Sequence, residues 1–256
     1  MKIITCFKVV PDEQDIELKD NGELSFERAK LTISNYDLNS IEAGAQLAEK
    51  GSHELIGVSV GGAKINESKL KKNALSRGLT SLFMLADEKL SNLDTHQTAK
   101  LLKIMVEKIA DWDLVLCGEG SSDLYAQQVG VQLGELLGAT VINSVSKITE
   151  ENGKIIVERT LENETEVIEV ELPAVLSVTS FINLPRIPGM KNILSAGKKP
   201  STVWSLTDIG GTCPSETVEV IETKAPRQMD RKKDITEDDS AESIQVFIEK
   251  IAAELR

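Results

Sequence analysis

The alternation of short β-branched runs with helical patterns over the first two-thirds of the chain constrains the fold more than any other feature. Four apolar runs are typical of buried strands, at residues 3–10, 54–60, 81–85 and 114–117. Apolar residues at three- and four-residue spacing predict helices at 39–50, 67–77, 95–109 and 124–137. Such alternation implies right-handed βαβ units, so we predict a doubly wound, Rossmann-like α/β fold with a mainly parallel sheet.

One segment interrupts this alternation. Residues 16–26 alternate apolar and polar side chains around Asn21-Gly22, which is a strong signal for a β-hairpin. The hairpin stands where the first helix of a usual dinucleotide-binding unit would begin, and no GxGxxG fingerprint follows the first strand. A usual NAD-binding domain is therefore not expected.

The last third of the chain has a different pattern. Strands are predicted at 141–148, 154–160, 166–171 and 172–178. Residues 183–239 show little regular pattern and hold five of the seven prolines, and such a long stretch is usually functional or supported by a partner. An amphipathic helix is expected at 240–255, either docked on its own domain or embracing another subunit. We therefore divide the chain into an α/β domain, 1–182, and a partner-recognition loop with a C-terminal arm, 183–256.

The composition excludes several classes of function. A net charge of -12 over 256 residues repels nucleic acid and anionic lipid, and an aromatic content of 4% leaves few rings for base stacking. The cysteines, Cys6, Cys117 and Cys213, form no CxxC pair, which favours reduced thiols in a cytoplasmic protein. The N-terminal apolar stretch is short and broken by Lys8, so we expect neither a signal peptide nor a membrane span.

The loop after the fourth predicted strand is the most informative segment, since no GxSxG elbow or HExxH motif indicates a bond-breaking site. It reads CGEGSSD and leads into LYAQQVG, at the carboxyl end of a strand, where doubly wound sheets bind ligands. Gly118 and Gly120 permit close backbone approach. Ser121, Ser122 and the amides of the helix start can donate to phosphate oxygens, and Asp123 is a suitable helix cap. Taken alone, the loop fits a capping turn as well as a ligand site.

The pattern GxxxxDxxxxQxG after the LVLCG strand resembles the adenine-nucleotide loop of electron-transfer flavoprotein beta subunits. Other segments agree in order and spacing: CFKVVPD near the N-terminus, NYDL at 35–38, VERTL at 157–161, LPAV at 172–175, NLPR at 183–186 and KKP at 198–200. The resemblance covers nearly the whole chain. It is greatest for the carnitine-linked, FixA-like branch, in MKIITCFKVVPDEQDI and NLPRIPGMKNIL.

The resemblance implies a subunit of a heterodimeric electron carrier with no turnover chemistry of its own. In that family an alpha subunit holds most of the redox-active FAD, and the beta subunit holds AMP, or a second FAD in electron-bifurcating members. Electrons pass between a donor and an acyl-CoA dehydrogenase or reductase, for example in anaerobic carnitine (crotonobetainyl-CoA) metabolism. The family's nucleotide site falls on Cys6, Asn35, Tyr36, Asp37, Leu38, Val60, Gly118, Glu119, Gly120, Ser121, Ser122, Asp123, Leu124, Tyr125, Ala126, Gln127, Gln128 and Val129.

Two segments bear on which nucleotide is bound. Thr95 and Thr98, at a helix start, resemble the paired threonines near the second flavin of bifurcating members, although hydroxyls there are also ordinary caps. Bifurcating members have Gly-Asp-Thr after the loop aspartate, where this chain has Leu124-Tyr125-Ala126. AMP and a second FAD therefore both stay open.

The segment RIPGMKNIL resembles the family's partner-recognition loop, in which an exposed aliphatic anchor inserts into the acyl-CoA dehydrogenase. Met190 stands at the place of the anchor, and methionine is flexible and polarizable enough for a transient interface. Met190 folded back as loop core is the alternative. The partner-binding residues carried over are Arg186, Ile187, Pro188, Met190, Ile193 and Leu194.

Two other functions stay open on the same fold. An adenine-nucleotide-binding enzyme, or an ATP-binding stress-type protein, would need a phosphate-contacting lysine or a hydrolytic carboxylate near residues 118–130, and that loop has no basic residue. A structural partner that has lost its nucleotide is the other alternative.

Overall fold

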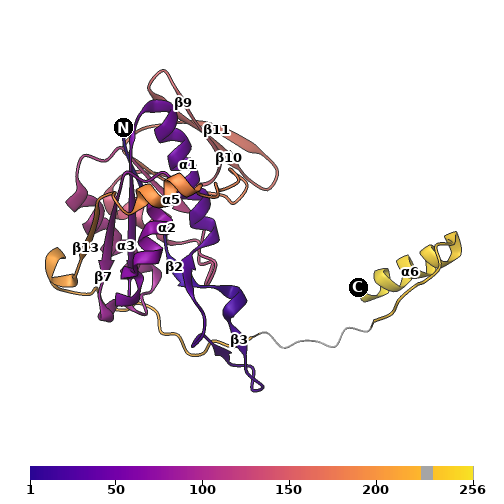
Figure 1. The fold of residues 1–256 in the computed structure, drawn as a ribbon. Helices are drawn as coiled ribbons and strands as arrows, with labels where there is room; N and C mark the ends of the chain where they lie inside the picture. Colours follow the sequence, from indigo (N-terminus) through magenta and orange to yellow (C-terminus); the bar gives the residue numbers. More distant parts are fainter. Residues whose placement is uncertain (226–232, 256) are drawn as a thin grey trace.

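The computed structural model describes residues 1–225 and 233–255. Its centre is a nine-stranded sheet with the order β11-β10-β9-β12-β8-β1-β6-β7-β13 (Figure 1). The strands from β9 to β13 in this order run parallel, and β10 and β11 extend the sheet as antiparallel strands. The predicted doubly wound fold with a mainly parallel sheet is therefore confirmed.

The elements have the following bounds in chain order. The strands of the large sheet are β1 (Lys2–Cys6), β6 (Glu54–Gly61), β7 (Ser81–Ala86), β8 (Leu114–Gly118), β9 (Thr140–Glu151), β10 (Lys154–Thr160), β11 (Thr165–Val170), β12 (Ala174–Val178) and β13 (Ser201–Trp204). The helices are α1 (Asn35–Gly51), α2 (Ser68–Leu75), α3 (Thr95–Ile109), α4 (Val129–Leu137), α5 (Met190–Ala196) and α6 (Ala241–Glu254).

Two hydrophobic cores cover the two faces of the sheet, because successive side chains of a strand point to opposite faces. On β1, Ile3 packs in the core with Ile41 of α1, whereas its neighbour Ile4 packs in the other core with Leu101 and Met105 of α3. All five of these side chains are fully buried. Both faces are apolar, which is why the parallel strands read as nearly continuous apolar runs.

Several local predictions are confirmed. The helix at 95–109 has the predicted bounds, because the Asp94 side chain and Gln97 form a capping box at its start. The hairpin at 16–26 forms from β3 (Glu17–Leu18) and β4 (Leu24–Ser25), with Gly22 at a φ of 82° in the turn. This left-handed backbone is where glycine is favoured.

The predicted first strand, 3–10, is wrong in extent. It divides after Cys6, and Val9–Pro11 forms β2, which pairs with β5 (Leu31–Ile33) in a separate two-stranded sheet. The cause is Asp37, whose carboxylate accepts a hydrogen bond from the backbone N of Lys8 and turns the chain there. The first helix also begins at Asn35, four residues before the predicted start, so the NYDL motif forms its first turn.

The segment predicted to lack regular structure, 183–239, contains α5 and β13. β13 pairs in parallel with β7, so the large sheet takes its outermost strand on that side from the chain beyond residue 182. Periodicity misses β13 because STVW is a short edge strand that follows a proline, Pro200. Pro226, one of the five prolines of the segment, lies outside the described residues.

The C-terminal helix forms as predicted, with Ser240 as its N-cap. Its apolar residues, including Ile244, Phe247 and Ile248, are exposed, and Figure 1 draws α6 apart from the sheet. Within the part of the chain that the structure describes, we find no helix with the length and apolar character needed to cross a membrane.

Candidate functional site

The candidate site lies where the strand order of the sheet reverses. From β1 the chain proceeds to β6 and β7 on one side, and then returns to β8 on the other side of β1. The carboxyl ends of the strands on either side of this switch point form the usual ligand crevice of a doubly wound sheet. Residues 119–128, which we call the β8–α4 loop, begin at this point.

Asp37 connects the parts of this edge. Its carboxylate accepts hydrogen bonds from the backbone N of Lys8 at 2.7 Å and of Gly118 at 3.3 Å, so one side chain of α1 binds the exits of β1 and β8. The side chain is buried, and this burial raises the pKa of Asp37 to about 7, against the lowering effect of the two amides and of Ser34. Asp37 therefore titrates near neutral pH, in contact with the exit of both central strands.

Gly118 is required by the close approach of α1 to the end of β8. A Cβ atom at this position would lie 2.7 Å from Asp37 Oδ1, 2.8 Å from the carbonyl carbon of Tyr36 and 2.9 Å from its oxygen. Two of these atoms belong to the backbone, so they cannot rotate away. This explains the glycine by the packing of α1, a reason that the sequence alone does not give.

The helix predicted at 124–137 begins instead at Val129, so Asp123 is not its cap. Asp123 pairs with Lys8, whose Nζ lies 2.6 Å from Asp123 Oδ2. Burial of the carboxyl opposes ionisation, but the hydrogen bonds from Lys8, Ser121 and the backbone N of Leu124, together with the charge of Lys8, outweigh it and lower the pKa of Asp123. The loop is extended by Tyr125 and Gln127, which have φ angles of 46° and 57° and so interrupt the helix.

Two residues of this site were not predicted, Lys8 and Ser34. Ser34 Oγ accepts a hydrogen bond from the backbone N of Ser122 at 3.3 Å, and Ser34 is fully buried. Both residues come from segments distant in sequence from the loop. The only sequence signal was their position beside matched motifs, Lys8 within CFKVVPD and Ser34 directly before NYDL.

A pair of tyrosines covers one side of the loop. The rings of Tyr36 and Tyr125 lie 4.9 Å apart at an interplanar angle of 39°. Gly120 passes beneath this pair, since a Cβ there would lie 2.5 Å from the Tyr125 ring. Tyr125 is exposed, and its side of the loop also presents Leu124, 68% exposed. The loop therefore offers an aromatic surface to whatever binds here.

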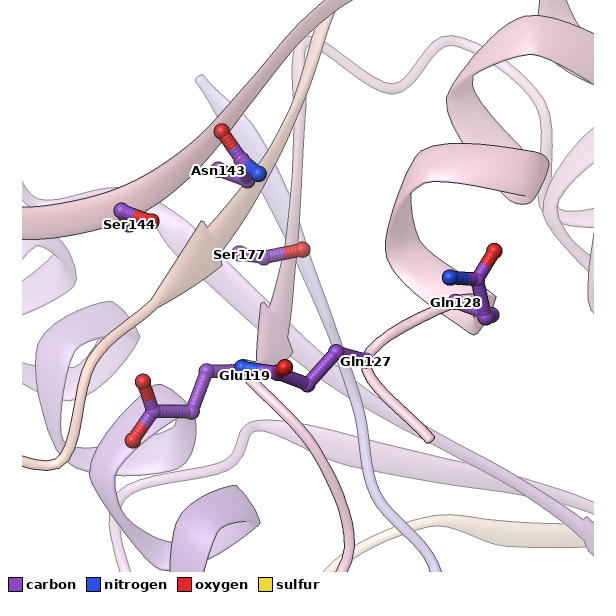
Figure 2. A pocket seen from close by; sticks show the side chains of 6 residues that line it. All are labelled: Glu119, Gln127, Gln128, Asn143, Ser144 and Ser177. Carbon is purple, nitrogen blue, oxygen red and sulfur yellow. The ribbon is translucent and has the colours of Figure 1, made fainter. Parts of the chain in front are cut away.

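A polar cavity of about 330 Å³ lies on the β12 and β9 side of the loop. Figure 2 shows Glu119 directly after β8, Gln127 and Gln128 at the end of the loop that leads into α4, and the strand residues around them. The strand residues of the lining are Asn143, Ser144 and Ser177. Arg159 Nη2 donates to Asn143 Oδ1 at 2.8 Å and fixes that amide. Amides and hydroxyls dominate the lining, so it suits uncharged polar groups such as ribose hydroxyls.

The remaining predicted residues lie at this edge with more ordinary roles. Cys6 is buried at the end of β1, and a hydrogen bond with Cys117 together with burial raises the pKa of its thiol. Val60 and Leu38 pack against the two cores, and Asn35 is exposed in the first turn of α1. Ala126 and Gln128 are exposed in the loop, and Val129 is half-buried as the first residue of α4.

The hydroxyls of Thr95 and Thr98 both take part in hydrogen bonds at the start of α3. Thr98 Oγ1 donates to the backbone O of Asp94 at 2.7 Å, as in an ordinary helix start. Thr95 Oγ1 accepts from Gln132 Nε2 at 3.4 Å and so connects α3 with α4. The hydroxyl of Thr98 is therefore bound to the N-cap residue of α3, whereas the hydroxyl of Thr95 lies between α3 and α4.

Residues 23–209 match the model of the electron transfer flavoprotein domain, which is well over half of the chain. The chain belongs to the electron transfer flavoprotein family. Proteins of this family are electron carriers rather than enzymes. The match spans the β8–α4 loop, the polar cavity and α5, so the site described above lies within the family domain.

In this electron transfer flavoprotein, residues 181–194 form an exposed apolar segment, which we call the docking segment after the role proposed for it below. Its large side chains are mostly exposed: Phe181 by 89%, Leu184 by 90%, Ile187 by 94%, Met190 by 72%, Ile193 by 45% and Leu194 by 70%. Met190 begins α5 and points to solvent, so the alternative that it forms loop core is wrong. Pro188 is half-buried, and Arg186 binds α1.

Proposed function

We propose that the chain is the beta subunit of a heterodimeric electron-transfer flavoprotein that passes electrons between a donor and an acyl-CoA dehydrogenase or reductase. The observation that carries the proposal is the family match over residues 23–209, which includes both the switch-point loop and the docking segment. An exposed apolar segment of this size on one face is typical of a docking surface. Transient redox contacts are small and depend on such anchors.

An alpha subunit is the proposed holder of the redox FAD. The arm supports this, because α6 has an exposed apolar stripe that needs a surface to cover it. The start of the C-terminal arm is held on the α/β domain, since Thr217 N and Oγ1 donate to Asp94 Oδ2 at 2.7 and 2.8 Å. The C-terminal arm is thus attached to the domain at Thr217 and ends in α6 with its exposed apolar stripe, which suits packing of α6 against a second subunit.

For this subunit we propose AMP as the resident nucleotide, with a second FAD as the less favoured possibility. Ligand pockets range over roughly 300–1,000 Å³, and the polar cavity of about 330 Å³ is at the small end, where a mononucleotide fits better than a dinucleotide. Lys8 and Ser122 would face the phosphate, and the tyrosine pair would face the base. The bound nucleotide would supply structural support rather than redox chemistry.

The resemblance to the FixA-like branch leads us to propose anaerobic carnitine metabolism, with crotonobetainyl-CoA reduction as the reaction served. All three cysteines are free thiols, which fits a reducing compartment such as the cytoplasm. The deciding experiment is coexpression with a candidate alpha subunit, followed by counting FAD and AMP in the purified complex. One FAD and one AMP per heterodimer would support the proposal, and two FAD would indicate a bifurcating carrier.

One observation favours the alternative of an adenine-nucleotide-binding enzyme. The fold brings Lys8, which follows β1, to the loop that lacks a basic residue of its own, with its Nζ 2.6 Å from Asp123. A lysine and a carboxylate beside a phosphate would satisfy the minimum that nucleotide hydrolysis needs. Incubation of the isolated chain with ATP distinguishes the two functions: phosphate release that disappears in Lys8→Ala would favour the enzyme.

A further inference from the structure

The docking segment has a polar inner side and an apolar outer side. Asn183 and Arg186 turn towards the protein and are half-buried, whereas Leu184 and Ile187 next to them are at least 90% exposed. Without other constraints, exposed apolar side chains such as Leu184 and Ile187 would pack against the nearest apolar surface of the protein. The hydrogen bonds and ion pairs of Asn183 and Arg186 with α1 therefore determine whether the apolar side of the segment stays exposed to solvent.

The first of these contacts is a reciprocal amide pair between α1 and the docking segment. Asn39 Nδ2 donates to the backbone O of Asn183 at 2.9 Å and of Ser180 at 3.2 Å. Asn183 Nδ2 donates back to the backbone O of Asn39 at 3.0 Å. Asn39 is 6% exposed, so these bonds are shielded from water and their loss would leave buried polar groups unpaired.

The second contact is an arginine fork on the next turn of α1. Arg186 Nε and Nη2 donate to the two carboxylate oxygens of Glu42 at 2.6 and 3.1 Å, and Arg186 also pairs with Glu49. Glu42 is 5% exposed, so its charge depends on this partner. Arg77 Nη1 donates to the backbone O of Arg186 at 2.8 Å, which fixes the main chain as well.

The same helix also holds the nucleotide edge, through Asp37 two residues before Asn39. Glu119, the first residue of the β8–α4 loop, accepts from the backbone N of Ser180 at 3.1 Å, directly before the docking segment. The first two turns of α1 are therefore a common platform for the nucleotide loop and for the docking segment.

We propose that Asn39 and Glu42 are positioning residues, which hold the docking segment on α1 so that its apolar side chains face a redox partner. The inference rests on the proposed function, since it assumes that the segment docks. Without the clamp the segment samples many orientations, and ordering it becomes a cost of each encounter. The expected consequence is a higher KM for the partner with kcat nearly unchanged, because electron transfer within the docked complex uses the same contacts.

The test has a first arm that does not depend on docking. Trypsin cleavage after Lys191, which is exposed, is followed by mass spectrometry under native conditions in the coexpressed heterodimer. Asn39→Ala and Asn183→Ala should each raise the cleavage rate by about tenfold, since each removes buried hydrogen bonds that hold the segment closed. The double variant should be cleaved faster than either single one, because each side chain donates to the backbone of the opposite segment and so forms bonds of its own. Lys50→Ala, on an exposed turn of α1, is the control and should cleave as wild type. Cleavage of both single variants at the wild-type rate would overturn the clamp.

The second arm measures the KM and kcat for purified crotonobetainyl-CoA reductase. Asn39→Ala should raise the KM by roughly five- to tenfold with kcat within twofold, and Glu42→Gln should do the same. Met190→Ala tests the proposed function separately, because it removes an anchor and leaves the clamp intact. If Met190→Ala raises the KM but Asn39→Ala does not, the segment docks without the clamp and the positioning role is wrong. If Met190→Ala leaves the KM unchanged, the docking function itself is wrong.

Discussion

Replacing Gly118 with alanine should disturb the packing of α1 against the exit of β8. The new Cβ would lie 2.8 and 2.9 Å from two backbone atoms of Tyr36, whereas ordinary contacts begin near 3.4 Å, so the first turn of α1 must retreat by about half an ångström. Overpacking of this kind costs about 1–3 kcal/mol. The retreat also lengthens the 3.3 Å bond from Gly118 N to Asp37, which adds about 0.5–1 kcal/mol.

The expected total is therefore about 1.5–4 kcal/mol, which lowers the Tm of a domain of this size by about 3–16 °C. Thermal unfolding of the coexpressed complex measures it, and loss of bound nucleotide on gel filtration should accompany it. Gly189→Ala is the matched control, since a Cβ there meets nothing within 4 Å. A Gly118→Ala variant with the Tm and nucleotide content of wild type would show that α1 does not define this edge.

Three further results are expected. Asp123→Ala together with Ser122→Ala should weaken nucleotide retention on gel filtration without unfolding the domain, because the ion pair with Lys8 is partly exposed and contributes at most about 1 kcal/mol to stability; unchanged nucleotide content would contradict the assignment of the loop. Burial raises the pKa of Asp37 from an ordinary 3.8 to about 7 in the folded protein, so the folded state binds the extra proton and stability should fall as pH rises from about 4 to 7, by up to about 4 kcal/mol. Urea unfolding should lose this slope in Asp37→Asn, and an equal slope in both proteins would refute the assignment. Met190→Ala should slow electron transfer to the acyl-CoA enzyme at subsaturating partner while flavin content stays the same, since truncating an interface anchor costs ~1–2 kcal/mol or more; a wild-type rate would count against the docking role.

The sequence predicts the scaffold well because the scaffold depends on local patterns. Hydrophobic periodicity and a capping box are enough to place α3 at 95–109, and Asn21-Gly22 is enough to place the hairpin. The start of α4 is different. It depends on Tyr125, whose positive φ and contact with Tyr36 involve a residue 89 positions away, and no local pattern contains that information.

The site shows the same division between local and distant information. The motif residues of the loop are found from the sequence, but Lys8 and Ser34 join them only through the packing of β1 and α1 against β8. The resemblance predicts that Arg186 binds a partner. In the structure its guanidinium forms ion pairs with Glu42 and Glu49 of α1. A charged side chain in an exposed apolar segment looks the same in sequence whether it binds inward or outward.

The route of the chain between β12 and β13 bears on how such carriers diversify. The docking segment leaves the sheet at β12, near its middle, crosses the face that carries α1 and α2, and returns at β13 on the far edge. Lys199 Nζ closes the crossing by donating to the backbone O of Leu75 and Leu79, at 2.9 and 2.6 Å. Both ends are thus fixed by strands of one sheet, and the chain between them meets the β8–α4 loop through the hydrogen bond from Ser180 N to Glu119 and meets α1 through Asn183 and Arg186. A crossing fixed at both ends could be exchanged as a unit, which would direct the carrier to a different redox partner while the β8–α4 loop stays as it is.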